Sequence, residues 1–207
     1  MSEEWLERWL VGRIGWHEDG GNAALKRHWS ASGRRVLVPM CGKTVDMLWL
    51  EGQGNEVVGV ELSEIAVRGF FEENELAFTM HPGDLTEFRA RDRRISLYCG
   101  DFFTFAGGPF DAHFDRGALI AMNPEVRPRY AEHTSSLLSP DAYQLVISLE
   151  YDDTVAKGPP FPVPADEMLS YWPHLARVEA RDDIENGPPK FLDAGLSEMI
   201  EVVWRSA

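Results

Sequence analysis

The chain has 207 residues, of which 44% are hydrophobic and 26% charged, enough apolar material for the core of one globular domain. Its 20 basic and 34 acidic residues give a net charge of −14, which repels nucleic-acid phosphates and predicts no nucleic-acid partner. No segment approaches the roughly 20 apolar residues that span a bilayer, so we expect no membrane association. Two cysteines and scattered histidines predict neither a disulfide framework nor a metal site. With an acidic N-terminus that lacks a secretory signal, these features predict a cytoplasmic protein, which we expect to be monomeric.

Three continuous apolar runs, at residues 36–38, 57–60 and 145–149, predict strands covered on both faces. Weaker runs at 95–99, 110–114 and 199–204 are further strand candidates. Helical patterns at 44–51, 63–75 and 124–138 alternate with these runs. This alternation predicts an α/β fold, an open doubly wound sheet formed by residues 1–207 as a single domain.

Two segments do not follow this alternation. Residues 1–30 contain four of the seven tryptophans, and we expect this segment to form a cap. Residues 158–164 read Gly-Pro-Pro-Phe-Pro-Val-Pro, and their prolines exclude a helix or a central strand. A stiff loop after a strand lies at the carboxyl edge of the sheet, where ligands bind in this architecture.

The turn after the first predicted strand does not fit a phosphate cradle. Gly42-Lys43-Thr44 resembles the end of a P-loop, but the required earlier glycine is replaced by Leu37. A dinucleotide fingerprint needs three spaced glycines, and the turn has only Gly42. A cofactor with a pyrophosphate is therefore disfavoured.

An acidic residue at the end of the second strand indicates a nucleoside ligand instead. Glu61 lies 19 residues after Gly42, where a carboxylate can accept hydrogen bonds from both ribose hydroxyls. S-adenosyl-L-methionine is a common nucleoside cofactor without phosphates, and its sulfonium is a cation that aromatic faces bind well. Trp5 and Trp9, four residues apart, share one helix face and could supply such faces. The alternatives are a solvated strand end for Glu61 and simple packing of the N-terminal helix for the tryptophans.

Several phrases, in order along the chain, resemble the thiopurine S-methyltransferase family. They are WLERW (5–9), GWH (15–17), VLVPMCGK (36–43), VVGVELSE (57–64), DRGAL (115–119) and GPPF (158–161). The resemblance implies the class I methyltransferase fold, Rossmann-like, with a seven-stranded, mostly parallel sheet and helices on both faces. It also implies that residues 1–30 cap the cofactor, S-adenosyl-L-methionine.

The resemblance also assigns roles to single residues. Arg116 is the implied catalytic residue, close to cofactor and substrate, and Trp16 is expected to close the N-terminal segment over the site. The family places an arginine near the substrate in the last part of the chain, where this sequence offers Lys190. The expected cofactor-binding residues are Trp5, Trp9, Trp16, Met40, Glu61, Asp101, Phe102 and Arg116, and the expected substrate-binding residues are Trp16, Arg116 and Lys190.

The function that these features favour is transfer of a methyl group to a small aromatic or heterocyclic thiol by in-line displacement. One alternative keeps methyl transfer but changes the acceptor to a selenium or tellurium compound or another small molecule. A second alternative is a protein that binds the nucleoside cofactor without turning it over.

Overall fold

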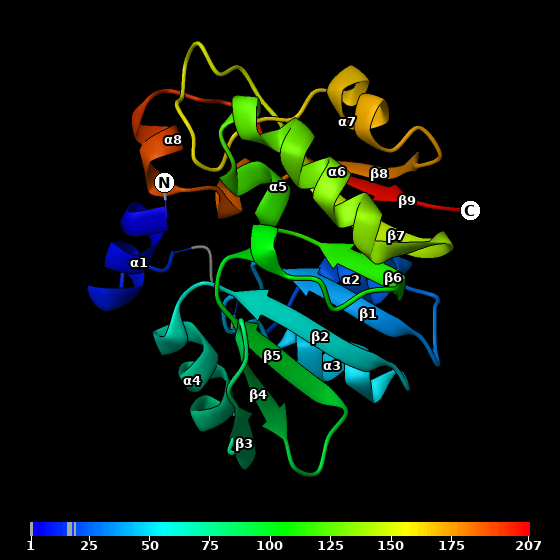
Figure 1. Ribbon diagram of the computed structural model, residues 1–207. Helices are drawn as coiled ribbons and strands as arrows, with labels where there is room; N and C mark the ends of the chain where they lie inside the picture. Colours follow the sequence, from blue (N-terminus) through cyan, green and yellow to red (C-terminus); the bar gives the residue numbers. More distant parts are fainter. Residues whose placement is uncertain (1, 16–17, 19) are drawn as a thin grey trace. The chain divides into compact units, whose positions relative to one another are not determined.

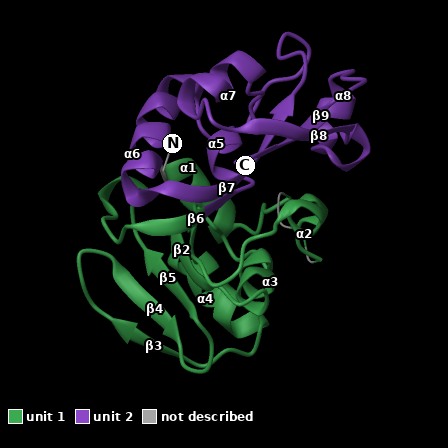
Figure 2. Ribbon diagram, turned by 90° about the vertical axis from the view of Figure 1, so that its right-hand side faces the viewer, with its two compact units in different colours: residues 1–112 green, residues 113–207 purple. Residues whose placement is uncertain are grey.

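The computed structural model describes residues 2–15, 18 and 20–207, and its helices and strands are shown in Figure 1. The chain forms two compact units, residues 1–112 and 113–207, which Figure 2 colours separately. Within the described residues, no helix has both the length and the apolar character needed to cross a bilayer.

The described residues of the first unit form five complete strands and four helices. The helices precede, alternate with and flank the strands, and α1 packs beside α4 (Figure 1). The strands are β1 (Arg35–Pro39), β2 (Glu56–Glu61), β3 (Phe78–His81), β4 (Thr86–Ala90) and β5 (Ile95–Cys99), and the helices are α1 (Ser2–Leu10), α2 (Ala23–His28), α3 (Asp46–Gly52) and α4 (Glu64–Glu73). A 3₁₀ turn at Phe102–Thr104 follows β5, and β6 (Phe110–Asp115) crosses into the second unit.

The second unit combines short helices with three strands. Its helices are α5 (Ala118–Ala121), α6 (Arg127–Leu137), α7 (Ala165–Tyr171) and α8 (Pro189–Asp193), with 3₁₀ turns at Pro124–Val126 and Ile184–Asn186. Its strands are β7 (Leu138–Glu150), β8 (Ala176–Asp182) and β9 (Ile200–Arg205).

The sheet has nine strands in the order β3-β4-β5-β2-β1-β6-β7-β9-β8, so the expected count of seven is wrong. The pairs β1–β2 and β2–β5 are parallel, as the buried apolar runs predict. The pairs β3–β4, β4–β5, β7–β9 and β8–β9 are antiparallel, so the sheet is parallel only in its interior. The sequence patterns missed β3, β4 and β8, which carry polar and partly exposed residues toward the two ends of the sheet.

The predicted strands and helices of the first unit owe their positions to apolar burial and one helix cap. Val57, Val58 and Val60 of β2 are buried, and α4 buries the apolar face that includes Phe70 and Phe71. Ser63 caps α4: its Oγ accepts a hydrogen bond from the Ala66 amide at 3.3 Å. Because Ser63 lies two residues after Glu61, this cap also fixes the backbone next to the residue that is predicted to bind the ribose.

The proline-rich segment 158–164, called the strap from here on, is neither helix nor strand, as its prolines predict. Its backbone is tied to other parts of the second unit. The Phe161 amide donates to the Ile120 carbonyl at 2.6 Å, and the Val163 amide donates to the Leu149 carbonyl at 2.7 Å. The Tyr151 hydroxyl donates to the Pro160 carbonyl at 2.6 Å. The strap is thus held by α5 and by the carboxyl end of β7.

Gly59 provides a test of how closely the first unit is packed. A Cβ at Gly59 would lie 2.6 Å from the Cys41 Sγ and 3.0 Å from the Met47 Sδ, and both neighbours are buried. We expect Gly59→Ala to lower the free energy of unfolding by about 1–3 kcal/mol through overpacking, measured by urea denaturation. Gly52→Ala is the control, because a Cβ at Gly52 meets nothing within 4 Å. Equal stability of the two variants would contradict this packing.

Candidate active site

Two residues in the turn after β1 have positive φ angles, which residues other than glycine rarely adopt. Met40 has φ 46° and Gly42 has φ 54°. The Trp9 indole lies against this turn: its Cζ2 atom is 3.2 Å from the position that a Cβ on Gly42 would occupy. Both the left-handed conformation and this close approach favour glycine at position 42. The glycine at position 42 is therefore explained by a tight turn that Trp9 of α1 covers.

Glu61 ends β2 and holds the turn in place. Its Oε2 accepts a hydrogen bond from the Gly42 amide at 2.9 Å, and its Oε1 accepts one from the Ser63 amide at 2.8 Å. The side chain is buried, and this burial raises the pKa of its carboxyl although the backbone amides act in the opposite direction. Each oxygen retains a lone pair, so the carboxylate can still accept ribose hydroxyls.

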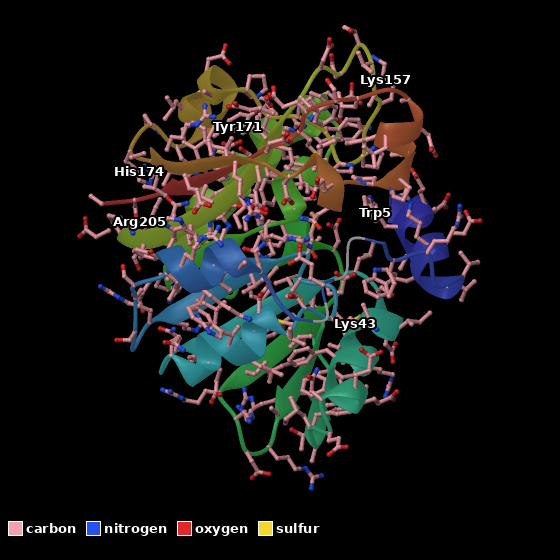
Figure 3. The ribbon with its side chains drawn as sticks, turned by 180° about the vertical axis from the view of Figure 1, so that it is seen from behind. Trp5, Lys43, Lys157, Tyr171, His174 and Arg205 are labelled. Carbon is pink, nitrogen blue, oxygen red and sulfur yellow. The ribbon has the colours of Figure 1, made fainter. Side chains whose placement is uncertain are left out.

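The Gly42-Lys43-Thr44 run is used for internal contacts. The Lys43 Nζ pairs with the Glu73 Oε1 at 2.6 Å and so ties the turn to the end of α4; Figure 3 labels Lys43. The Thr44 hydroxyl donates to the Asp46 Oδ2 at 2.9 Å near the start of α3. Both side chains stabilise the turn, a role that needs no phosphate.

Asp101 and Phe102 follow the neighbouring strand at the same edge of the sheet. Cys99 of β5 is the register partner of Glu61, and the Gly100 amide donates to the Glu61 carbonyl at 2.9 Å. Asp101 is exposed, and its Oδ1 accepts a hydrogen bond from the Phe103 amide at 3.0 Å. Phe102 is buried. The first unit thus brings Asp101 and Phe102 to the same edge as Glu61, as a shared nucleoside site requires.

The two remaining aromatic candidates of the N-terminal segment are Trp5 and Trp16. Trp5 lies on α1, where Figure 3 labels it, and the Arg8 guanidinium stacks over its ring at 4.7 Å from the centroid. One face of Trp5 therefore already holds a cation. Trp16 lies outside the described residues.

Arg116 lies in a turn of the second unit that the neighbouring carboxylate organises. Asp115 is buried at the end of β6, and its Oδ1 accepts the Ala118 amide at 2.9 Å. Its Oδ2 accepts the Leu119 amide at 3.2 Å and the Tyr130 hydroxyl at 2.7 Å. These bonds hold the start of α5, two residues after Arg116, and Arg116 is itself half-buried. Asp115 fixes the backbone that carries Arg116, and burial raises the pKa of its carboxyl to about 6.

Lys190 of α8 is linked to the segment that leads into the strap. Its Nζ donates to the Lys157 carbonyl at 3.0 Å and lies 5.3 Å from the centroid of the Phe191 ring. Figure 3 labels Lys157 in this segment. Phe191 in turn packs on Tyr151, with ring centroids 4.9 Å apart. Lys190 is thus a neighbour of the strap, at an exposed position.

Sequence patterns missed two contributors to these arrangements. Tyr130 binds Asp115 from 15 positions along the chain, and Glu73 binds Lys43 from 30 positions. Neither pair follows a motif or a helical spacing. A polar side chain among the apolar positions of a predicted helix, as at Tyr130, is the only signal that the sequence offers.

Solved structures with the same architecture define the fold. The N-methyltransferase NodS from Bradyrhizobium japonicum, in complex with S-adenosyl-L-homocysteine, has a TM-score of 0.66 at 14% identity, covering 99% of this chain and 98% of that chain. The 1,6-didemethyltoxoflavin-N1-methyltransferase from Burkholderia thailandensis has a TM-score of 0.65 at 18% identity, covering 100% and 87%. The fold is therefore that of the class I S-adenosylmethionine-dependent methyltransferases.

Sequence comparison identifies the family. The family model described as Thiopurine S-methyltransferase (TPMT) matches residues 1–207. The protein of that name from Bordetella petrii is 43% identical over 214 residues, 99% of this chain and 97% of the relative. The one from Pseudomonas aeruginosa is 42% identical over 216 residues, with 99% and 97% covered. The chain belongs to the thiopurine S-methyltransferase family, which confirms the predicted class of enzyme and its cofactor, S-adenosyl-L-methionine.

The double role of Glu61 leads to a prediction about cofactor affinity. In Glu61→Gln, an amide donor would face the Gly42 or Ser63 amide, so one hydrogen bond is lost and the turn shifts. We expect the dissociation constant for S-adenosylhomocysteine, measured by calorimetry, to rise about tenfold or more. Glu64→Gln is the control, because Glu64 is exposed and pairs only locally, with Arg68 of the next helical turn. Equal affinity of the two variants for S-adenosylhomocysteine would show that Glu61 does not contribute to cofactor binding.

Asp115 leads to a prediction about stability and pH. Its pKa of about 6 in the folded chain exceeds the ordinary value of 3.8, so folding favours the protonated form. The stability that this side chain contributes is therefore fully present below pH 3.8 and is lost as the pH rises through 6. Asp115→Asn cannot titrate and should lack this loss.

The measurement is urea unfolding of parent and Asp115→Asn between about pH 4 and 7. The difference in unfolding free energy between the two proteins should change by on the order of 3 kcal/mol over this range, in favour of the variant at higher pH. Asp141→Asn, at an exposed position of β7, is the control. A difference that stays constant with pH would show that Asp115 does not titrate in this range.

Proposed function

We propose that the protein transfers the methyl group of S-adenosyl-L-methionine to the sulfur of a small aromatic or heterocyclic thiol. Membership of the thiopurine S-methyltransferase family supports a thiol acceptor. The observation that carries the catalytic part is the turn at Asp115, whose carboxyl accepts the Ala118 and Leu119 amides and so fixes the backbone beside Arg116. A side chain on a fixed turn can orient an acceptor without reorganisation during the reaction.

The residues of the first unit fit the cofactor. Glu61 binds the ribose with the lone pairs that its two backbone hydrogen bonds leave available. Asp101 and Phe102, at the same sheet edge, flank the adenine. Trp9 and Met40, at the left-handed turn, contact the methionine part, and Trp5 contributes an aromatic face. When bound, this cofactor supplies a methyl group on a positively charged sulfur.

The acceptor side uses residues of the second unit. Arg116 binds the acceptor and favours its thiolate form by a charge-assisted hydrogen bond. Lys190 acts on the same side, through its contact with the segment before the strap. Trp16 and the rest of residues 1–30 close over the bound ligands and exclude water, which favours the meeting of opposite charges.

The chemical balance needs no general base from the chain. Aromatic and heterocyclic thiols are acidic, so the thiol proton passes to solvent before the transfer. The thiolate sulfur forms the new bond to the methyl carbon as the bond from that carbon to the sulfonium breaks. Two opposite charges disappear, and a thioether and S-adenosylhomocysteine remain. Arg116 contributes orientation and charge, not proton transfer.

The test is transfer of a labelled methyl group to 6-mercaptopurine, with selenite as a second acceptor. We expect turnover on the thiol, and Arg116→Ala should lower kcat/KM about 100-fold because an oriented charged donor is lost. The dissociation constant for S-adenosylhomocysteine, which Glu61 and the turn determine, should stay within about threefold. Arg116→Lys keeps the charge without the planar fork and should recover only part of the activity.

Other outcomes would assign another function. Turnover on selenite alone would favour the selenium or tellurium acceptors. Cofactor binding without transfer to either acceptor would favour a protein that only holds the cofactor. We further propose, from the composition and charge, that the enzyme acts as a cytoplasmic monomer, which sedimentation at working concentration tests.

A further inference from the structure

Arg127, the first residue of α6, has an unusual environment. Its side chain is 0% exposed, and it is the only lysine or arginine among the buried residues that the structure describes. Its Nη1 contacts both carboxylate oxygens of Glu167 at 3.0 Å. Its Nε and Nη2 atoms have no hydrogen-bond partner within the described residues. The guanidinium therefore pairs through one of its three nitrogens.

A gain in folding stability does not explain the ion pair between Arg127 and Glu167. A guanidinium and a carboxylate that form two parallel hydrogen bonds use two nitrogens of the arginine. Here one nitrogen serves both oxygens, and buried donors that lack partners destabilise the fold. Buried ion pairs are in general replaceable by apolar side chains without loss of stability. The placement of the guanidinium calls for another reason.

The two described contacts of Arg127 both lead to the strap. Glu167 lies in the first turn of α7, which begins directly after the strap ends at Pro164. The Phe161 ring, in the middle of the strap, has its centroid 6.0 Å from the Arg127 Cζ. Glu167 is itself fixed by the Tyr171 hydroxyl, which donates to its Oε1 at 2.8 Å. Arg127 thus acts on the middle of the strap and on the helix that follows it.

The strap in turn is connected to the turn that carries Arg116. The Phe161 amide donates to the carbonyl of Ile120 in α5, and α5 starts two residues after Arg116. A displacement of Phe161 would therefore displace α5 and the backbone that precedes it. This connection runs entirely through residues of the second unit.

We propose that Arg127 is a positioning residue for the methyl acceptor: through Glu167 and Phe161 it sets the position of the strap, and through the strap that of Arg116. The inference rests on the proposed function, because Arg116 is the acceptor-binding group in it. Arg127 has no direct contact with the acceptor in this role. Its effect is on the KM for the acceptor, because an Arg116 side chain that is displaced from its proper position binds the acceptor poorly.

The experiment uses the full chain with Arg127→Met combined with Glu167→Gln. The double variant removes both charges together, so no uncompensated charge stays buried, and the glutamine can still accept the Tyr171 hydroxyl. Arg129→Met is the matched control: it removes the same charge from the same helix, at an exposed position. Acceptor KM, kcat, the S-adenosylhomocysteine dissociation constant and the melting temperature are measured for all three proteins.

We expect the double variant to raise the KM for 6-mercaptopurine about tenfold, with the dissociation constant for S-adenosylhomocysteine within about twofold. Arg129→Met should match the parent in both. A folded double variant with the parent's KM, or one whose cofactor affinity falls by the same factor as KM rises, would overturn the proposal.

A second measurement does not depend on activity. Hydrogen exchange at the Phe161 and Val163 amides, which donate the backbone bonds of the strap, should be about tenfold faster in the double variant and unchanged in Arg129→Met. Unchanged exchange in the double variant would refute the link between Arg127 and the strap. If the parent itself fails to methylate the thiol, the proposed function fails, whereas the exchange measurement still decides this link.

Discussion

The carboxylate of Glu61 is the contact on which the turn after β1 and the connection before α4 depend. It is buried at the end of β2, and its two oxygens bind amides from two different connections: Gly42 after β1 and Ser63 before α4. Moving either connection would leave a buried charge without its partner, which is costly. The same carboxylate has lone pairs left for a ligand. A single residue therefore holds the turn in place, and the same residue is the one we propose for binding the ribose.

The second unit repeats this physical solution at a different strand. Asp115, at the end of β6, is also buried and also accepts backbone amides from the connection that follows it. In both cases a buried carboxylate at the end of a strand accepts backbone amides: those of Gly42 and Ser63 for Glu61, and those of the first two residues of α5 for Asp115. The difference lies in the neighbouring side chain. Glu61 is followed after one residue by the helix cap Ser63, whereas Asp115 is followed directly by Arg116.

The sequence predicted the parts of this arrangement that local patterns encode. Continuous apolar runs located β1, β2 and the last part of β7, because strands buried on both faces must be apolar throughout. The spacing to Gly42 singled out Glu61. β8 could not be found in this way, since most of its residues are exposed and four of its seven are charged. Strands of that kind are held by pairing with β9, which is a long-range contact.

The acceptor side depends on such long-range contacts more than the cofactor side does. Arg127 and Glu167 lie 40 positions apart in the sequence, and the hydrogen-bonded pair Phe161 and Ile120 lie 41 positions apart. Motifs report backbone turns that a shared cofactor requires, and these turns are local. The acceptor meets a surface whose position results from several distant pairings, each changeable without altering a motif. Family membership therefore fixes the cofactor chemistry of this chain more closely than the choice of its acceptor.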